Sequence, residues 1–189
     1  MQTDMTVGKP MKMLLNFTIP VFLGNVFQQL YSMADAVIVG KFVGTKGLAA
    51  VGATGTITFL IIGFLMGVTT GVTVLTSQKF GAGRMDEMRK TVGNAAILSA
   101  VIAVVMTAVS MLGMHRLLVF MHTPEDIFDG AYGYIMIICA GIFTQVLYNL
   151  VSSILRALGN SKTPLYFLIL AAGLNIVLDL VFIIFFHNI

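Results

Sequence analysis

Five long apolar stretches dominate the sequence, and each is long enough to cross a lipid bilayer. A helix needs roughly 20 residues to span about 30 Å of hydrocarbon. Bounded by charged residues, the stretches run approximately over 13–40, 47–78, 91–114, 130–155 and 163–186. Only 10% of the 189 residues are charged, against about 25% in soluble domains. Because the alternation typical of membrane barrel strands does not occur, we predict an all-α, polytopic membrane helix bundle with five transmembrane helices.

The Lys and Arg residues predict the orientation of these helices. With the N-terminus in the cytoplasm, eight of them fall on the inner side, namely Lys9, Lys12, Lys79, Arg84, Arg89, Lys90, Arg156 and Lys162. The outer loops then hold three, Lys41, Lys46 and Arg116, which follows the positive-inside rule. A signal peptide is a poor interpretation of the start, since the first apolar run is too long and no small-residue cleavage site follows it. We therefore expect a multi-pass protein of the cell membrane. Its partner is the lipid bilayer, and it is not expected to bind nucleic acid.

The first stretch contains a proline well inside its span. The ring of Pro20 removes one backbone hydrogen bond and leaves the carbonyl of Asn16 without its helical partner. Such a break survives in a membrane where neighbouring protein or water satisfies the freed group. We predict a kink and a hinge at Pro20, in a helix that faces a protein interior or a cavity.

Small and polar residues mark faces of two other stretches. Gly63, Gly67 and Gly71 recur every four residues, a pattern that favours close approach of another helix more than it favours a hinge. Gln145, Asn149, Ser152 and Arg156 lie at spacings of four, three and four, which puts them on one helical face. That face fits helix-to-helix hydrogen bonding and the lining of a cavity equally well. The single cysteine, Cys139, lies mid-helix and is expected to be a packing residue.

Two aspartates, Asp35 and Asp179, lie inside the predicted spans. Placing an aspartate at the centre of a membrane helix costs about 2.5–3.5 kcal/mol, so each needs a partner or a use. The first and fifth helices run in the same direction, with Asp35 six residues before Lys41 and Asp179 eight before His187. At about 1.5 Å per residue, both lie roughly 9–12 Å below the outer helix ends. The two carboxylates are therefore expected to meet.

Amide and hydroxyl groups accompany both aspartates. Asn25, Gln28, Ser32 and Asp35 form one polar stripe, and Asn175 shares a face with Asp179. Carboxylate, amide and hydroxyl oxygens suit a small hard cation such as Na⁺, and carboxylates also carry protons. The alternative is that each aspartate only hydrogen-bonds a neighbouring helix. We favour a cation or proton site at Asp35, Asn175 and Asp179.

Two segments resemble a known transporter family. MADAVIVGKFVGTKGLAAVGA (33–53) and SILRALGNSKTPLYFLILAAGLNIVLDLVFI (153–183) closely resemble the first and fifth helix regions of the multidrug and toxic compound extrusion family, called MATE. The resemblance covers nearly the whole chain, and its second segment is the most specific part.

The resemblance implies twelve helices in two six-helix lobes that export drugs and organic cations in exchange for Na⁺ or H⁺. It assigns the helix 1 aspartate to Asp35, the helix 5 asparagine and aspartate to Asn175 and Asp179, and the helix 1 proline to Pro20. Residues expected to line the cavity or contact substrate are Gln28, Ser32, Tyr134 and Asn149. Tyr134 is a weaker match to a lobe-lining tyrosine, and its position also fits an interfacial anchor.

The chain departs from the family in length. Five helices are predicted, so residues 1–189 correspond to part of the N-terminal lobe, without the sixth helix and the second lobe. Alternating access needs two halves that move around a central site. We therefore expect a cation site in this chain but not transport by the chain alone.

Three other functions would each require different features of the sequence. A lipid-linked oligosaccharide flippase of the same superfamily should line its cavity with cationic residues for phosphate, yet no Lys or Arg lies mid-span. A membrane-embedded enzyme is disfavoured because His115, His122 and His187 lie at helix ends and no catalytic constellation occurs. A non-transporting assembly subunit fits the composition as well. No cofactor is expected beyond the coupling ion, Na⁺ or H⁺, and no enzymatic activity.

Overall fold

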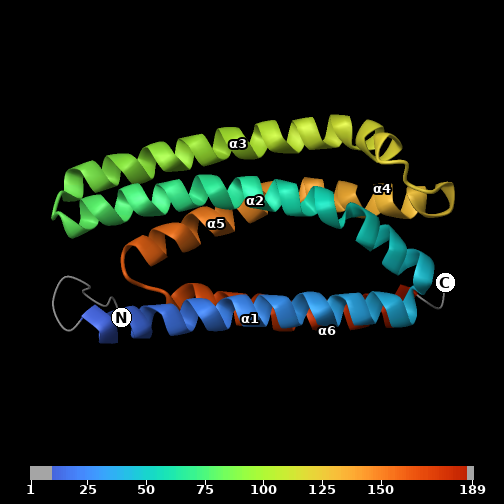
Figure 1. Cartoon of the computed structure of the whole chain (residues 1–189), viewed down its shortest axis with the longest axis horizontal. Coiled ribbons are helices and arrows are strands. Elements are labelled where there is room, and N and C mark those ends of the chain that lie inside the picture. The colour runs from blue at the N-terminus through green and yellow to red at the C-terminus, as the bar shows by residue number, and fades with distance from the viewer. Residues whose placement is uncertain (1–9, 187–189) are drawn as a thin grey trace. The chain divides into compact units, whose positions relative to one another are not determined.

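The described part of the chain is built of helices. The computed structural model describes residues 10–186, with side chains from 11 to 182, and this part contains no strand. Lys9 and His187, which entered the arguments on orientation and depth, lie outside the described residues. The helices are α1 (Pro10–Phe42), α2 (Thr45–Gly81), α3 (Met85–Phe120), α4 (Glu125–Ala140), α5 (Ile142–Ala157) and α6 (Lys162–Phe186) (Figure 1). The predicted all-α fold is confirmed.

The helices account for the predicted membrane spans. Four of them, α1, α2, α3 and α6, are long and apolar enough to cross a membrane. The pair α4 and α5 forms a fifth span if it is taken as one bent segment. Large apolar side chains such as Phe59, Leu112 and Leu170 are exposed on these helices, which in a helix bundle of this composition is the surface that faces lipid. The chain is a multi-pass membrane protein.

The fourth span differs from the single helix expected over 130–155. It begins earlier, at Glu125, and it is broken at Gly141, where α4 and α5 meet at an angle of 45°. The backbone N–H of Gly141 donates to two carbonyl oxygens, 3.1 Å from that of Ile137 and 3.0 Å from that of Ile138. The bond to Ile138 has the tighter spacing of a 3₁₀ turn, a recognised site of helix bending.

The chain divides into two compact units, which are described separately. One comprises Met1–Gly44 and Leu155–Ile189, and the other comprises Thr45–Ile154. The first unit contains α1 and α6, and the second contains α2, α3, α4 and most of α5. The turn between α1 and α2 has Gly44 at a φ of 88°, a left-handed conformation that glycine adopts without strain.

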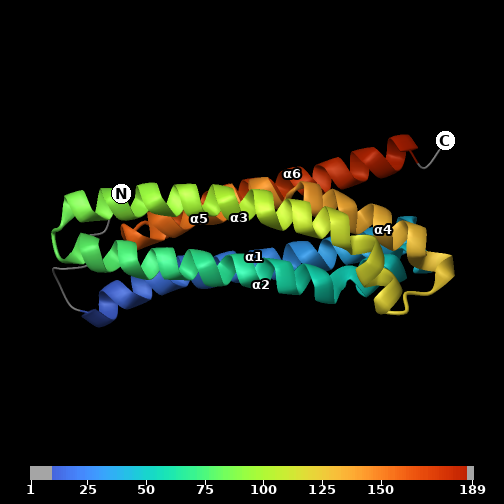
Figure 2. The same cartoon turned by 90° about the horizontal axis from the view of Figure 1, so that it is seen from above.

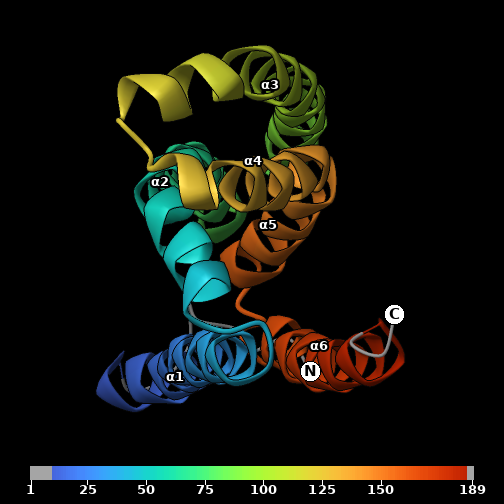
Figure 3. The same ribbon diagram turned by 90° about the vertical axis from the view of Figure 1, so that its right-hand side faces the viewer.

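In the first unit, α1 and α6 lie side by side (Figure 3) and run in the same direction, as Figure 2 shows. The parallel arrangement was predicted from the order of the spans. Before α6, Gly159 adopts a φ of 81°, and the side chain of Asn160 caps the helix by accepting the backbone N–H of Thr163 at 3.1 Å. Caps of this kind satisfy one of the free donors at a helix start.

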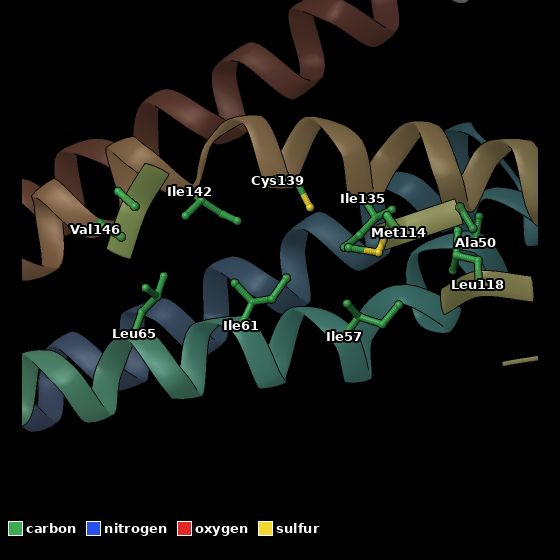
Figure 4. Close-up of a cluster of buried hydrophobic side chains, with 12 residues drawn as sticks. Ala50, Ile57, Ile61, Leu65, Met114, Leu118, Ile135, Cys139, Ile142 and Val146 are labelled. Carbon is green, nitrogen blue, oxygen red and sulfur yellow. The ribbon is translucent and has the colours of Figure 1, made fainter. Parts of the chain in front are cut away.

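In the second unit, α2, α3 and α4 pack around one apolar core (Figure 4). Three side chains of α4 at a spacing of four, Ala131, Ile135 and Cys139, are fully buried, so Cys139 is the packing residue that was expected. They face Ile57 and Ile61 of α2, and the cluster also includes Leu118 of α3 and Ile142 and Val146 of α5. The regular spacing follows from one helical face turned to its neighbours.

The glycine strip of α2 does not pack as predicted. A Cβ atom built on Gly63, Gly67 or Gly71 would meet no described atom within 4 Å. Close approaches occur instead at Gly130, whose added Cβ would lie 3.5 Å from that of Ala50, and at Gly24 in the first unit. The small-xxx-small spacing marks faces where close packing is allowed, but it does not tell which of them a neighbour occupies.

Candidate cation site

The two membrane aspartates meet between α1 and α6. The side chains of Asp35 and Asp179 are near enough to interact electrostatically, and both residues are half-buried. The sequence placed both at one depth on parallel helices, and the structure brings them together. Because two neighbouring carboxylates repel when both are charged, such a pair is suited to a shared proton or a bound cation.

The register of α1 against α6 explains why these two residues meet. A Cβ on Gly24 would touch Leu168 at 3.6 Å and Leu165 at 3.7 Å, so the helices are in close contact there. Asp35 is eleven residues beyond Gly24 and Asp179 is eleven residues beyond Leu168. Eleven residues make about three helical turns. The same faces therefore meet again at the aspartates, roughly 16 Å further along.

The burial pattern of α6 supports this register. Half-buried residues of α6 recur at spacings of three and four along the helix: Leu165, Leu168, Ala172, Asn175 and Asp179. Several of their neighbours, including Leu170, Leu174 and Leu178, are exposed. Asn175 thus shares the contact face with Asp179, as the sequence predicted.

Two oxygen atoms on this face have no hydrogen-bond partner in the described part of the chain. They are Oδ1 of Asn175 and Oδ2 of Asp179, and both are buried. Buried acceptors without a donor are costly, particularly at membrane depth. Both atoms are acceptors when Asp179 is ionised, so the local chemistry fits a bound cation or an added proton.

The donor set also limits which ion would fit. Among the described residues there is no group of three or more His, Cys, Asp and Glu side chains that could hold a metal ion. The site instead offers two carboxylates and one amide, which are hard oxygen ligands. This set suits Na⁺ or a proton better than a transition metal, which prefers imidazole or thiolate.

The polar stripe of α1 is only partly turned towards α6. Asn25, Gln28 and Ser32 are exposed, whereas Asp35 is half-buried. The hydroxyl of Ser32 donates to the backbone carbonyl of Gln28 at 3.0 Å, which satisfies it within its own helix. Of the predicted stripe, the structure therefore brings Asp35 alone to Asp179.

Pro20 is buried and lies one turn before Gly24, inside an uninterrupted α1. The helix therefore continues through the proline, which still lacks the N–H that would bond to Asn16. The predicted hinge at Pro20 stays a prediction.

The remaining predicted cavity residues belong to the second unit. Tyr134 lies half-buried on α4, and Asn149 is buried on α5, where its amide donates to the backbone carbonyl of Gln145 at 2.9 Å. Their assignment to a substrate cavity stays a prediction.

Sequence reasoning missed the contact that sets the register of the site. Gly24 interrupts an apolar run of α1 without a second small residue four positions away to mark it. The available signal was its spacing of four from Pro20 and eleven from Asp35, which places all three near one helical face.

Comparison with known proteins connects this geometry to a family. The MatE family model matches residues 20–181 of the chain. The chain is 32% identical over 184 residues to "Probable multidrug resistance protein YpnP" of Bacillus subtilis, a match that covers 97% of this chain and 41% of that protein. It is 30% identical over 162 residues to "Probable multidrug resistance protein YoeA" of the same organism, covering 86% of this chain and 35% of the relative.

A solved structure gives the same result. It is described as the outward-facing conformation of a multidrug resistance MATE family transporter of the MOP superfamily, and it superimposes with a TM-score of 0.90 at 28% identity. The match covers 97% of this chain and 41% of that one. The chain thus spans about two fifths of the length of these relatives, which are named as transporters or resistance proteins rather than enzymes. The match along residues 20–181 shows that the chain belongs to the MatE family, the multidrug and toxic compound extrusion family whose helices it resembles.

Proposed function

We propose that this chain forms the cation-binding part of an antiporter that exports drugs and organic cations in exchange for Na⁺ or H⁺. The observation that carries the proposal is the meeting of Asp35 and Asp179, together with a buried oxygen atom on Asp179 and another on Asn175 that have no partner among the described residues. An intramembrane carboxylate pair is expensive unless it is used. Relatives named as multidrug resistance proteins support the substrate class.

In this proposal the ion controls how α1 packs on α6. A proton or Na⁺ between Asp35 and Asp179 neutralises the pair and allows the two helices to stay in contact. Loss of the ion leaves two like charges in close contact, which favours separation of the helices at this level. Because α1 lacks one backbone hydrogen bond at Pro20, bending there absorbs the movement about 22 Å from Asp35 along the helix.

The remaining cavity assignments belong to the same proposal. The exposed face of α1 with Gln28 and Ser32 would line a polar path. In the second unit, Tyr134 and Asn149 are proposed to contact substrate. The N-terminus is proposed to be cytoplasmic, on the basis of the Lys and Arg distribution. Transport by alternating access needs two halves, so we propose that further polypeptide, in the same or another chain, completes the transporter.

A chimera tests this function. Residues 1–189 replace the matching part of YpnP, and efflux of ethidium, an organic cation, is followed by fluorescence in drug-sensitive cells. We expect the chimera to lower ethidium accumulation. An ionophore that collapses the gradient of the coupling ion, Na⁺ or H⁺, should abolish this effect, and an ionophore for the other ion should not. The ionophore that acts identifies the coupling ion. Efflux that survives the loss of both gradients would contradict cation coupling.

A further inference from the structure

One face of α3 carries exposed apolar side chains that lead to a lysine. Ile97, Val101, Val104 and Val105 are each more than half exposed, and they follow one another at helical spacing, so they lie on one face. Lys90 is also exposed and lies on this face, seven residues or about two turns before Ile97. The face that meets the lipid chains therefore has a positive charge at its end.

The charge-free run after Lys90 indicates its depth in the membrane. No Lys, Arg, Asp or Glu occurs between Lys90 and Arg116, which are 26 residues apart, or about 39 Å along a helix. A bilayer measures about 30 Å across its hydrocarbon and about 40–45 Å with its headgroups. With α3 as a membrane span, Lys90 lies among the headgroups of one leaflet. Ile97, about 10 Å further along, then lies beside the acyl chains.

The acidic residues near Lys90 do not neutralise it. An oxygen of Glu87, one turn before it, is 3.7 Å from Nζ of Lys79, and another is 3.4 Å from Nη1 of Arg84, so two other cations share that carboxylate. The second nearby acid, Asp86, forms no ion pair with Lys90 in the structure described for residues 11–182. Lys90 is thus a cation at headgroup level that has no carboxylate partner within this part of the chain.

The two ends of α3 differ in charge, and they lie at opposite ends of the second unit (Figure 1). Residues 79–90, at the α2–α3 turn, contain four Lys or Arg and two Asp or Glu, a net charge of +2. Residues 115–129, between α3 and α4, contain one Arg and three Asp or Glu, a net charge of −2 with His neutral. An anionic headgroup is attracted to basic residues at the membrane surface, so it favours the end with Lys90.

We propose that the end of α3 at Lys90 binds an anionic phospholipid, with Lys90 on the phosphate and the acyl chain along Ile97 and Val101. Asn94 is exposed on the same face, one turn beyond Lys90, and its amide can donate a hydrogen bond to a headgroup oxygen. The apolar face next to the lysine favours a lipid over free phosphate. The site lies in the second unit and does not depend on the proposed exchange activity.

A tryptophan introduced at Ile97 tests this site, because the chain contains no tryptophan of its own. The full chain with Ile97→Trp is reconstituted in bilayers of phosphatidylcholine and phosphatidylglycerol, and bromine on the acyl chains of one lipid or the other quenches the fluorescence. The two quenching curves give the binding of the anionic lipid relative to the neutral one. We expect phosphatidylglycerol to be favoured about fivefold. With the tryptophan instead at Phe59, an exposed position within the apolar part of α2, neither lipid should be favoured.

Substitutions at Lys90 connect the preference to this side chain. In the Ile97→Trp protein, Lys90→Gln should remove most of the preference for phosphatidylglycerol, and Lys90→Arg should keep it because the positive charge stays. Lys46→Gln is the matched control. It removes an exposed lysine at the start of α2, at the other end of the second unit, and should leave the preference unchanged.

Four results would overturn the site. They are equal binding of the two lipids at position 97, a preference that survives Lys90→Gln, an equal loss with Lys46→Gln, or loss of the preference on adding millimolar inorganic phosphate, since the site would then take free phosphate. If Ile97→Trp does not insert into the bilayer, Val101→Trp reports on the same face and is judged by the same criteria.

Discussion

Replacing Asp35 with Asn is expected to abolish cation-coupled efflux in the chimera with YpnP. The substitution keeps the size and hydrogen-bonding capacity of the side chain but removes the charge that a proton or Na⁺ must neutralise. Coupling free energies between two sites are about 1–3 kcal/mol, so we expect the gradient-dependent part of ethidium efflux to fall about tenfold or more. Asp179→Asn should give the same loss, since the proposed site comprises both carboxylates.

Asp126 provides the control for this prediction. It is an exposed acid in the first turn of α4, and Asp126→Asn should leave efflux close to the parent level. Membrane insertion of each variant is checked by its amount in the membrane fraction. Coupled efflux at parental rate with Asp35→Asn would remove the aspartate pair from the mechanism.

Replacing Gly24 with Leu is expected to separate α1 from α6 and disrupt the aspartate pair without touching it. A Cβ fits against Leu168 and Leu165 at ordinary contact distances of 3.6 and 3.7 Å, so Gly24→Ala should be tolerated within about 0.5 kcal/mol. A leucine has no room for its branched end. Overpacking of this kind costs about 1–3 kcal/mol, measured as the free energy of unfolding in mixed micelles by circular dichroism.

Gly173 of α6 gives a matched control for Gly24. It is exposed and an added Cβ would meet no described atom within 4 Å, so Gly173→Leu should change the unfolding free energy by less than about 0.5 kcal/mol. The register argument adds a second readout, since Gly24→Leu should weaken cation binding at Asp35 and Asp179, three turns away. Equal effects of the two leucine substitutions would show that the α1–α6 contact at Gly24 does not control the site.

The spans and the aspartate pair could be predicted from the sequence because their signals are local. A long apolar run needs no partner to be recognised, and a carboxylate inside it is costly wherever the helix packs. The common depth of Asp35 and Asp179 followed from helix direction and rise per residue. Helix direction and rise per residue do not depend on how the helices pack against one another.

The sequence did not predict which of several similar helix faces packs against a neighbouring helix. The strip of Gly63, Gly67 and Gly71 had the stronger pattern, yet the close helix contact formed at the single Gly24. Likewise, the polar stripe of α1 suggested that Gln28 and Ser32 accompany Asp35, whereas both are exposed. Which face a helix buries depends on the shape of its neighbour, and that information lies elsewhere in the chain.

The break at Gly141 was also hidden in an apolar run. Glycine is common in membrane helices and often leaves them unbent, so composition alone did not separate α4 from α5. The bend became visible only from the paired hydrogen bonds to Ile137 and Ile138. It divides a predicted single span into two helices, α4 and α5.

The most direct test of the central claim is an infrared difference spectrum of the protonated-carboxyl band, recorded on the full chain in lipid when Na⁺ is added or the pH is lowered. The account predicts that one of the two ions changes this band in the parent, and that Asp35→Asn and Asp179→Asn each remove the same change. A spectrum that responds to neither ion, or a response that survives both substitutions, would contradict a shared cation site at Asp35 and Asp179.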